Sequence, residues 1–258
     1  RRKGCIRRIS EVFEANGFDK VHVDRYGNTI GTITGKRPGQ KLLFDGHMDT
    51  VPVTNPDEWI HPPFGGEIHD GKVYGRGASD MKGAIAAMAV AAAEFNKAVD
   101  GDFAGEINVA GVVHEECFEG VAAREISAYV KPDYVIIGEA SRGNVKIGQR
   151  GRAEIKVEVF GKLAHSANPE KGINAVYKMC KIIEEIRKLE PTHHDVLGDG
   201  ILELTDIKSS PYPGASVVPE HCMATYDRRL LTGETPEGEI KPLQDLVDRM
   251  MQEDDELK

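Results

Sequence analysis

The chain has 258 residues, of which 40% are hydrophobic and 29% are charged, as expected for one large or two ordinary globular domains. Its formal net charge is −9 and it lacks any basic block, which argues against a nucleic-acid or anionic-membrane partner and favours a small-molecule substrate. The longest apolar run, residues 84–93, is far shorter than the roughly 18 residues of a membrane span, and no signal-peptide pattern opens the chain, so we expect a cytoplasmic protein.

The first predicted element is a helix over residues 1–16, whose apolar side chains fall on one face and which stops at Gly17. It begins without a Met or a capping residue, so we expect that an upstream segment has been removed. Residues 21–23 and 29–33 predict two short strands around a turn at residues 25–28.

The next apolar run, residues 42–44, is followed by Gly46, His47 and Asp49. This pattern indicates a buried strand with an imidazole and a carboxylate at its tip. A histidine that binds a metal needs its second ring nitrogen held by a carboxylate or a carbonyl, and Asp49 is placed to do this. The alternative is a strand end whose polar residues merely meet solvent.

Residues 52–74 are rich in proline and glycine and predict a long ordered loop of the kind that carries function. We interpret its two histidines, His61 and His69, as ordinary loop residues. The loop leads through a glycine-rich segment to Asp80 and an alanine-rich helix over residues 81–98. Asp80 is either the N-cap of this helix or a metal ligand.

Two further apolar runs, which we also expect to form buried strands, end in acidic residues. Residues 106–113 run directly into His114, Glu115 and Glu116, and residues 134–137 are followed by Glu139. Because helical segments separate the runs and parallel strands place their ligand sites at their carboxyl ends, we expect these side chains to converge with His47. Carboxylates so close together would repel, and a divalent cation, preferably two, relieves the repulsion. The four cysteines show no C-x-x-C pairing, so any metal must be bound by histidine and carboxylates.

The character of the chain changes near residue 149, and we predict one domain over residues 1–148 and another over 149–258. Residues 152–160 alternate strictly between apolar and charged side chains, as in a strand with one face in solvent. A helix over residues 173–189, strands over 201–207 and 221–230 and a last helix from Pro242 complete the pattern. This order predicts a small α+β sandwich that lacks a final strand.

Four motifs occur together in the chain: residues 46–52 (GHMDTVP), residues 75–83 (GRGASDMKG), the acidic pair Glu115 and Glu116, and residues 161–167 (GKLAHSA). In order and spacing they resemble the dinuclear zinc amidohydrolase and exopeptidase family, which includes acetylornithine deacetylase, succinyl-diaminopimelate desuccinylase, aminoacylases and glutamate carboxypeptidases. Residues 150–152 (RGR), 227–230 (DRRL) and 233–235 (GET) look like the branch called selenium-metabolism hydrolases of the YgeY type.

The resemblance implies an α/β fold with a zinc-exopeptidase-like mixed sheet flanked by helices, plus a small α+β, ferredoxin-like lid and dimerisation domain. It makes His47 and Glu139 ligands of one metal, Glu116 a ligand of the other, and Asp80 the carboxylate that bridges both. The implied metals are two Zn²⁺ ions, with Co²⁺ or Mn²⁺ as substitutes. It also implies a cis peptide between Asp80 and Met81.

By the same resemblance, Asp49 orients His47 and Glu115 is the general base that takes a proton from the zinc-activated water. His165 corresponds to a lid histidine that reaches the site of a partner subunit, which implies a homodimer through the lid. Arg229 matches a lid arginine associated with a substrate carboxylate. The expected reaction is hydrolysis of an amide bond in an N-acyl amino acid, a dipeptide or a related small substrate, by a metallopeptidase or a deacetylase.

Two departures from the family pattern matter. Residues 216–219 read SVVP where many relatives have Asn-Val-Ile-Pro, which leaves an Asn contact to substrate in doubt. The chain also stops at Lys258, before the segment that supplies a second-metal histidine in the family, so we expect a sequence truncated at both ends. The alternative function is therefore a non-catalytic fragment or dimerisation module that keeps the fold and at most one metal.

Overall fold

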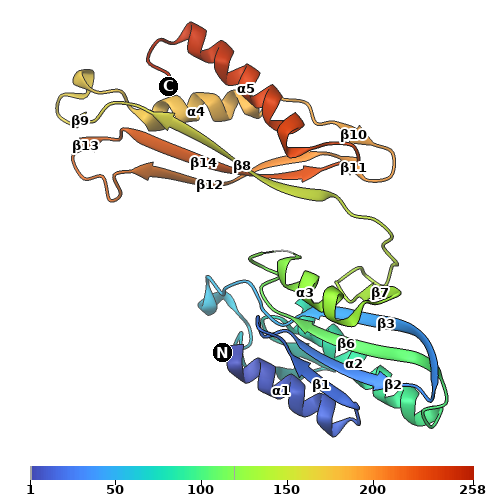
Figure 1. Cartoon of the computed structure of the whole chain (residues 1–258). Helices are drawn as coiled ribbons and strands as arrows, with labels where there is room; N and C mark the ends of the chain where they lie inside the picture. The colour runs from blue at the N-terminus through green and yellow to red at the C-terminus, as the bar shows by residue number, and fades with distance from the viewer. Residues whose placement is uncertain (1, 119) are drawn as a thin grey trace. The chain divides into compact units, whose positions relative to one another are not determined.

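The computed structural model describes residues 2–118 and 120–258, so Arg1, with which the predicted N-terminal helix begins, lies outside the described residues. The chain forms two compact units, Arg1–Val145 and Lys146–Lys258 (Figure 1). Their boundary lies close to the predicted one after residue 148. Among the described helices, none combines the length and the apolar character needed to cross a membrane.

The first unit is built on a five-stranded mixed sheet with the strand order β1-β2-β6-β3-β7. Its helices and strands are α1 (Arg2–Ala15), β1 (Lys20–Val23), β2 (Thr29–Thr34), β3 (Arg37–His47), η1 (Pro56–Glu58), β4 (Glu67–His69), β5 (Lys72–Tyr74), η2 (Ala78–Lys82), α2 (Gly83–Ala98), β6 (Ala104–Val112), α3 (Val121–Val130) and β7 (Tyr134–Ile137). β1, β2 and β6 are antiparallel to their neighbours in turn, whereas β6, β3 and β7 run parallel to one another.

The three parallel strands end at the same edge of the sheet. His47 of β3 is in register with Val112 of β6, and Asp45 of β3 is in register with Ile137 of β7. The residues that follow each strand therefore start from one place, as the sequence predicts. This edge carries the candidate site.

Helices α1, α2 and α3 pack on this sheet (Figure 1). The small side chains of Ala89, Ala92 and Ala93 let α2 lie close to Val109 of β6, and Ile126 of α3 is buried in the core that also holds Leu43 of β3. Burial of these apolar faces is the main favourable term that holds the unit together.

One prediction for this sheet is wrong. The apolar run at residues 134–137 was expected to form a buried strand, but all four side chains of β7 are exposed. β7 is the last strand in the sheet order. Among the described residues it pairs with β3 along one edge, and no strand pairs with its other edge.

The second unit is a three-stranded antiparallel sheet, in the order β12-β14-β8, with α4 and α5 on the same face (Figure 1). Its elements are β8 (Gly151–Phe160), β9 (Ala164–His165), η3 (Pro169–Lys171), α4 (Ala175–Ile186), β10 (His193–His194), β11 (Gly198–Asp199), β12 (Ile201–Ser210), β13 (Val217–Val218), β14 (His221–Leu230) and α5 (Pro236–Glu253). Ile155 and Val159 of β8 point into the core beneath Met179 and Ile182 of α4. The predicted alternation of this strand and the strand-helix-strand-strand-helix order are both confirmed.

The last helix begins earlier than predicted. Thr235 caps α5 by accepting a hydrogen bond from the backbone N–H of Gly238, and Pro236 occupies the first turn, so Pro242 lies inside the helix. A proline in the first turn needs no hydrogen-bond partner for its nitrogen. This capping pattern, Thr-Pro-Glu, is the local signal that the interpretation of Pro242 as the helix start overlooked.

Candidate metal centre

His47 lies at the centre of the candidate site and is almost fully buried, with 2% of its surface exposed. It is the last residue of β3, where strand geometry fixes the direction of its ring. Its Nδ1 lies 3.0 Å from the backbone carbonyl oxygen of Asp49, which leaves Nε2 directed toward the carboxylates. One ring nitrogen is therefore held by the chain and the other is available as a ligand, as a metal-binding histidine requires.

Three carboxylates surround Nε2 of His47. Oδ1 of Asp80 is 2.8 Å away, Oε1 of Glu139 is 3.3 Å away and Oε2 of Glu115 is 3.9 Å away. Their residues come from the turn before α2, the segment after β7 and the segment after β6. The predicted convergence at the carboxyl edge of the sheet is thus what the structure has.

Two triads of donor atoms share His47. One consists of His47, Asp80 and Glu139, and the other of His47, Glu115 and Glu116, and in each triad all donor atoms lie within 4.8 Å of one another. Four carboxylates around one imidazole form a strongly anionic set. The donor chemistry therefore fits one or two divalent cations.

Asp49 connects two of the segments that form the site. Its carboxylate accepts hydrogen bonds from the backbone N–H groups of Glu115 and Glu116, each at 3.2 Å. The nearest contact of His47 to this residue is to its carbonyl oxygen, whereas the carboxylate oxygen is 3.9 Å from Nδ1. Asp49 therefore holds the acidic pair in place with its side chain and the imidazole with its backbone.

Asp80 lies in a short π-helical turn, Ala78–Lys82, with non-helical backbone angles at Asp80 and Met81. The cap position of α2 is occupied by Lys82, so the alternative reading of Asp80 as an N-cap is wrong. The peptide between Asp80 and Met81 is cis, as the family resemblance implies. The side chain of Asp80 points to His47 instead of to the helix.

The pKa values of the site reflect its crowded negative charge. Burial by itself lowers the pKa of His47, but the hydrogen bond to Asp80 and the charges of the other carboxylates outweigh it, and the pKa is raised. Burial also raises the pKa of Glu139, and the charge of Asp80 adds to this although His47 opposes it. In the absence of a cation, the raised pKa values therefore favour the protonated forms of His47 and Glu139.

Asp45, which lies two residues before His47 on β3, was not among the predicted site residues. Its Oδ1 is buried and has no hydrogen-bond partner among the described residues. Burial raises the pKa of this carboxyl to about 6. Its position within an apolar run is the sequence signal that could have identified it.

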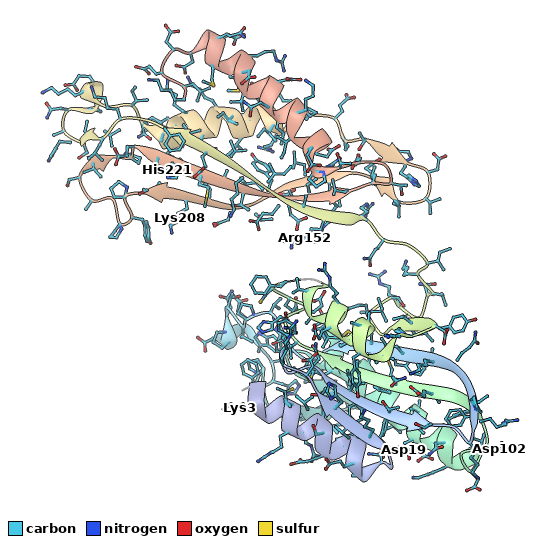
Figure 2. The ribbon with its side chains drawn as sticks, viewed as in Figure 1. Lys3, Asp19, Asp102, Arg152, Lys208 and His221 are labelled. Atoms are coloured by element: carbon cyan, nitrogen blue, oxygen red, sulfur yellow. The ribbon has the colours of Figure 1, made fainter. Side chains whose placement is uncertain are left out.

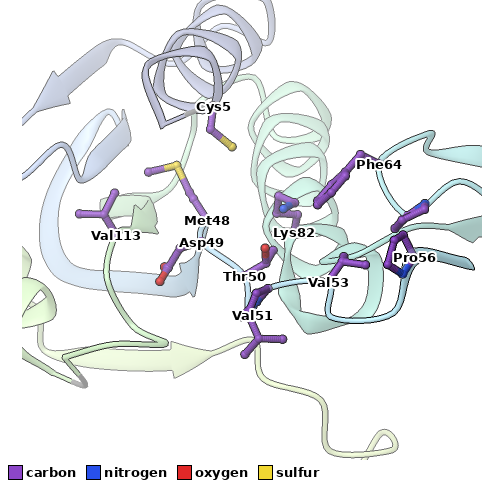
Figure 3. A pocket seen from close by; sticks show the side chains of 12 residues that line it. Cys5, Met48, Asp49, Thr50, Val51, Val53, Pro56, Phe64, Lys82 and Val113 are labelled. Atoms are coloured by element: carbon purple, nitrogen blue, oxygen red, sulfur yellow. The ribbon is translucent and has the colours of Figure 1, made fainter. Parts of the chain in front are cut away.

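A cavity of about 730 Å³ adjoins the centre through Asp49 (Figure 3). Its walls are mainly apolar, with Met48, Val53 and Phe64 among them, and Lys82 supplies an amine. A mostly apolar pocket with a few polar groups is typical of small-molecule sites.

The remaining two predicted site residues, His165 and Arg229, belong to the second unit. His165 ends β9 and its Nδ1 accepts a hydrogen bond from the backbone of Ala167. Arg229 lies on β14 and pairs with Asp227 at 2.8 Å. Asp227 also contacts Arg152, which is labelled on β8 in Figure 2.

The structure also gathers two histidines that the sequence suggested were ordinary loop residues. His61 and His69 both contact the carboxylate of Glu67. Glu67 precedes His69 by two residues, and this spacing on a strand is the sequence signal that could have revealed the cluster.

Comparison with known proteins shows what the chain is similar to. Residues 43–231 match the family described as Peptidase family M20/M25/M40. The chain is 35% identical over 248 residues to the protein YgeY of Escherichia coli (strain K12), which covers 95% of the chain and 60% of YgeY. It is 31% identical over 238 residues to succinyl-diaminopimelate desuccinylase 2 of Ruegeria sp. (strain TM1040), which covers 87% of the chain and 60% of that protein.

Among solved structures, human carnosine dipeptidase 1 superposes with a TM-score of 0.68 at 18% identity, covering 98% of the chain and 69% of that structure. These matches confirm the predicted fold class and the resemblance stated from the motifs. The chain spans about three fifths of the length of the curated relatives that it matches.

Proposed function

The chain belongs to peptidase family M20/M25/M40, and on this premise we propose that the whole protein hydrolyses an amide bond in a small substrate at a centre of two zinc ions. One relative is named as a succinyl-diaminopimelate desuccinylase, and removal of a succinyl group from an amine breaks an amide bond. We propose an N-acyl amino acid, a dipeptide or a related small molecule as the substrate.

One observation carries the proposal: a buried imidazole meets several carboxylates at the shared end of three parallel strands. Oxygen atoms of Asp80 and Glu139 lie 2.8 and 3.3 Å from Nε2 of His47. Structural ion pairs rarely gather so many like charges, whereas a metal centre requires them.

The residues proposed to hold the ions are those that the family resemblance implies, and the triad of His47, Asp80 and Glu139 supports part of this assignment. His47 and Glu139 would bind one ion, Glu116 the other, and Asp80 would be shared. Imidazole and carboxylate ligands suit zinc, and Co²⁺ and Mn²⁺ are the expected substitutes. When bound, two such ions lower the pKa of a water molecule and polarise the scissile carbonyl, so no side-chain nucleophile is needed.

Glu115 is proposed as the general base. The family resemblance implies this role, and the carboxylate oxygen lies 3.9 Å from Nε2 of His47, beside the proposed ligands. It would take a proton from water and return it to the leaving amine. Asp49 supports it by fixing the backbone of the acidic pair.

The second unit is proposed to complete the site. Arg229 would bind a substrate carboxylate, for which its planar donor group is suited. His165 would reach the centre of a partner subunit and stabilise the developing oxyanion. Within the described residues β8 and β12 are the edges of a three-stranded sheet, and an edge of this kind favours pairing with a second copy, which supports a homodimer.

A second candidate function is a non-catalytic or dimerisation module with at most one metal. It is favoured by the scarcity of histidine: among the described residues, both triads depend on the single imidazole of His47. The difference in bound zinc between the parent chain and Asp80→Ala distinguishes the two. A difference of about two ions supports the enzyme, and a difference of one or none supports the module.

The proposed function is tested on the whole protein, extended to the length of its relatives. Metal-stripped protein and protein reconstituted with zinc are incubated with N-acyl amino acids, dipeptides and carbamoyl compounds, and the release of free amine is measured. We expect release only after reconstitution. Equal release without metal, or no release from any compound, would reject the proposal.

A further inference from the structure

A second cluster of potential metal ligands lies in the long loop of the first unit and shares no residue with the His47 centre. It consists of His61, Glu67 and His69, whose donor atoms all lie within 4.8 Å of one another. None of these residues belongs to either triad around His47. The cluster is therefore a separate feature.

The local sequence explains how the cluster forms. Glu67 and His69 are two residues apart on β4, so their side chains lie on the same face of the strand. β4 pairs with β5 so that Glu67 is opposite Tyr74, whose ring packs against that of His61 with centroids 4.2 Å apart. The hairpin thus presents Glu67 and His69 to a histidine from the preceding segment.

Two ring nitrogens meet at one oxygen of this cluster. Nδ1 of His61 is 3.1 Å from Oε2 of Glu67, and Nε2 of His69 is 2.9 Å from the same atom. The hydrogen bonds from His69 and then His61 lower the pKa of Glu67, so this carboxylate stays ionised. Two nitrogens and an anionic oxygen already face one another.

We propose that His61, Glu67 and His69 form a further binding site for a divalent transition-metal ion such as Zn²⁺. The nitrogen ligands decide the class of metal, because imidazole favours zinc, copper and nickel over magnesium and calcium. Three protein ligands leave one position of a tetrahedral ion for water.

The distances fit such an ion closely. With metal–ligand bonds of about 2.0–2.1 Å, the donors of a tetrahedral site lie roughly 3.3 Å apart. The two nitrogen–oxygen distances of 3.1 and 2.9 Å need to open by only a few tenths of an ångström.

The two imidazoles must also turn. Their rings are stacked with centroids 4.2 Å apart, and stacked rings cannot both point a nitrogen straight at one ion. The side chain of His69 is about half exposed, which leaves room for this rotation.

A bound ion would tie residue 61 to the hairpin. This part of the loop is already closed by a hydrogen bond from the backbone N–H of Arg76 to the carbonyl of Pro63, and Pro63 and Phe64 line the cavity beside the candidate centre. The ion would therefore stiffen one wall of that cavity.

The proposal is tested by counting ions and by observing the rings. Metal-stripped chain, the double variant His61→Gln, His69→Gln, the single variant Glu67→Gln and the control His22→Gln are dialysed against Co²⁺. The control replaces another stacked histidine, one that lies on Tyr129. In parallel, long-range ¹H–¹⁵N spectra of the imidazoles are recorded during titration with Zn²⁺.

We expect the parent and the His22→Gln control to bind one more Co²⁺ per chain than the double variant and the Glu67→Gln variant. Zinc should shift the ¹⁵N resonances of Nδ1 in His61 and Nε2 in His69. Circular dichroism checks that the variants are folded. If the double variant is unfolded, the Co²⁺ stoichiometry of Glu67→Gln and the imidazole spectra of the parent chain test the proposal. Equal Co²⁺ stoichiometry in the parent and the folded variants, or ring resonances that do not shift with zinc, would show that the cluster is held by hydrogen bonds and does not bind metal.

Discussion

Replacement of Glu115 by glutamine tests whether Glu115 is the general base while Glu116 binds metal. The change keeps the size of the side chain and removes its capacity to accept a proton. Among the three carboxylates near His47, Asp80 and Glu139 are closer to Nε2, at 2.8 and 3.3 Å, than Glu115 at 3.9 Å. The two closer carboxylates remain in the variant, so we expect it to keep its metal.

The expected loss is therefore in the chemical step. A general base contributes about 10²–10⁴-fold to the rate, or about 2.7–5.4 kcal/mol of transition-state stabilisation. Steady-state kinetics of the whole protein should show this fall in kcat, with the zinc content unchanged.

The neighbouring Glu116→Gln variant is the matched control, because Asp49 holds both backbones in the same way. It should lose zinc, and its activity should recover in part at high zinc concentration. If instead Glu115→Gln lost zinc and Glu116→Gln kept it, the two roles would have to be exchanged.

The other predictions concern the shared ligand, the second unit and the dimer. Asp80→Ala should release the ions of the centre in equilibrium dialysis, and in the parent chain zinc affinity should fall as the pH drops through the raised pKa of His47, because protons and zinc compete for Nε2. Arg228→Ala should lower the free energy of unfolding in urea by about 3 kcal/mol, since it leaves two partly buried glutamates without their partner. Replacement of the less buried neighbour, Arg229→Ala, should cost less than about 1 kcal/mol. Mixing the inactive His165→Ala protein with the inactive Glu115→Gln protein should restore part of the activity if subunits exchange. If activity does not recover although exchange is proven, His165 acts only in its own chain.

Much of the first unit could be predicted from the sequence, because the signals for its strands and for the polar residues after them are local. Apolar runs at residues 42–44, 106–113 and 134–137 mark strands, and the residues after them carry the polar groups. Parallel strands end at one edge, so the convergence of His47 with Glu115 and Glu139 follows from topology alone.

Other features depend on contacts that no local pattern records. The exposure of β7 depends on its place at the end of the strand order, and the nearest group of Asp49 to His47 is a carbonyl that any residue would supply. The cluster at His61 forms only because the chain folds back onto the β4–β5 hairpin. Its one local signal is the spacing of Glu67 and His69, which is short enough to be overlooked in a loop.

The central claim is a two-ion centre that shares Asp80, and anomalous diffraction from crystals of the zinc-reconstituted whole protein tests it most directly. Difference maps above and below the zinc edge should show two peaks at this site, one against His47 and Glu139 and the other against Glu116, with Asp80 between them. A single peak, or none within bonding distance of Nε2 of His47, would contradict the account.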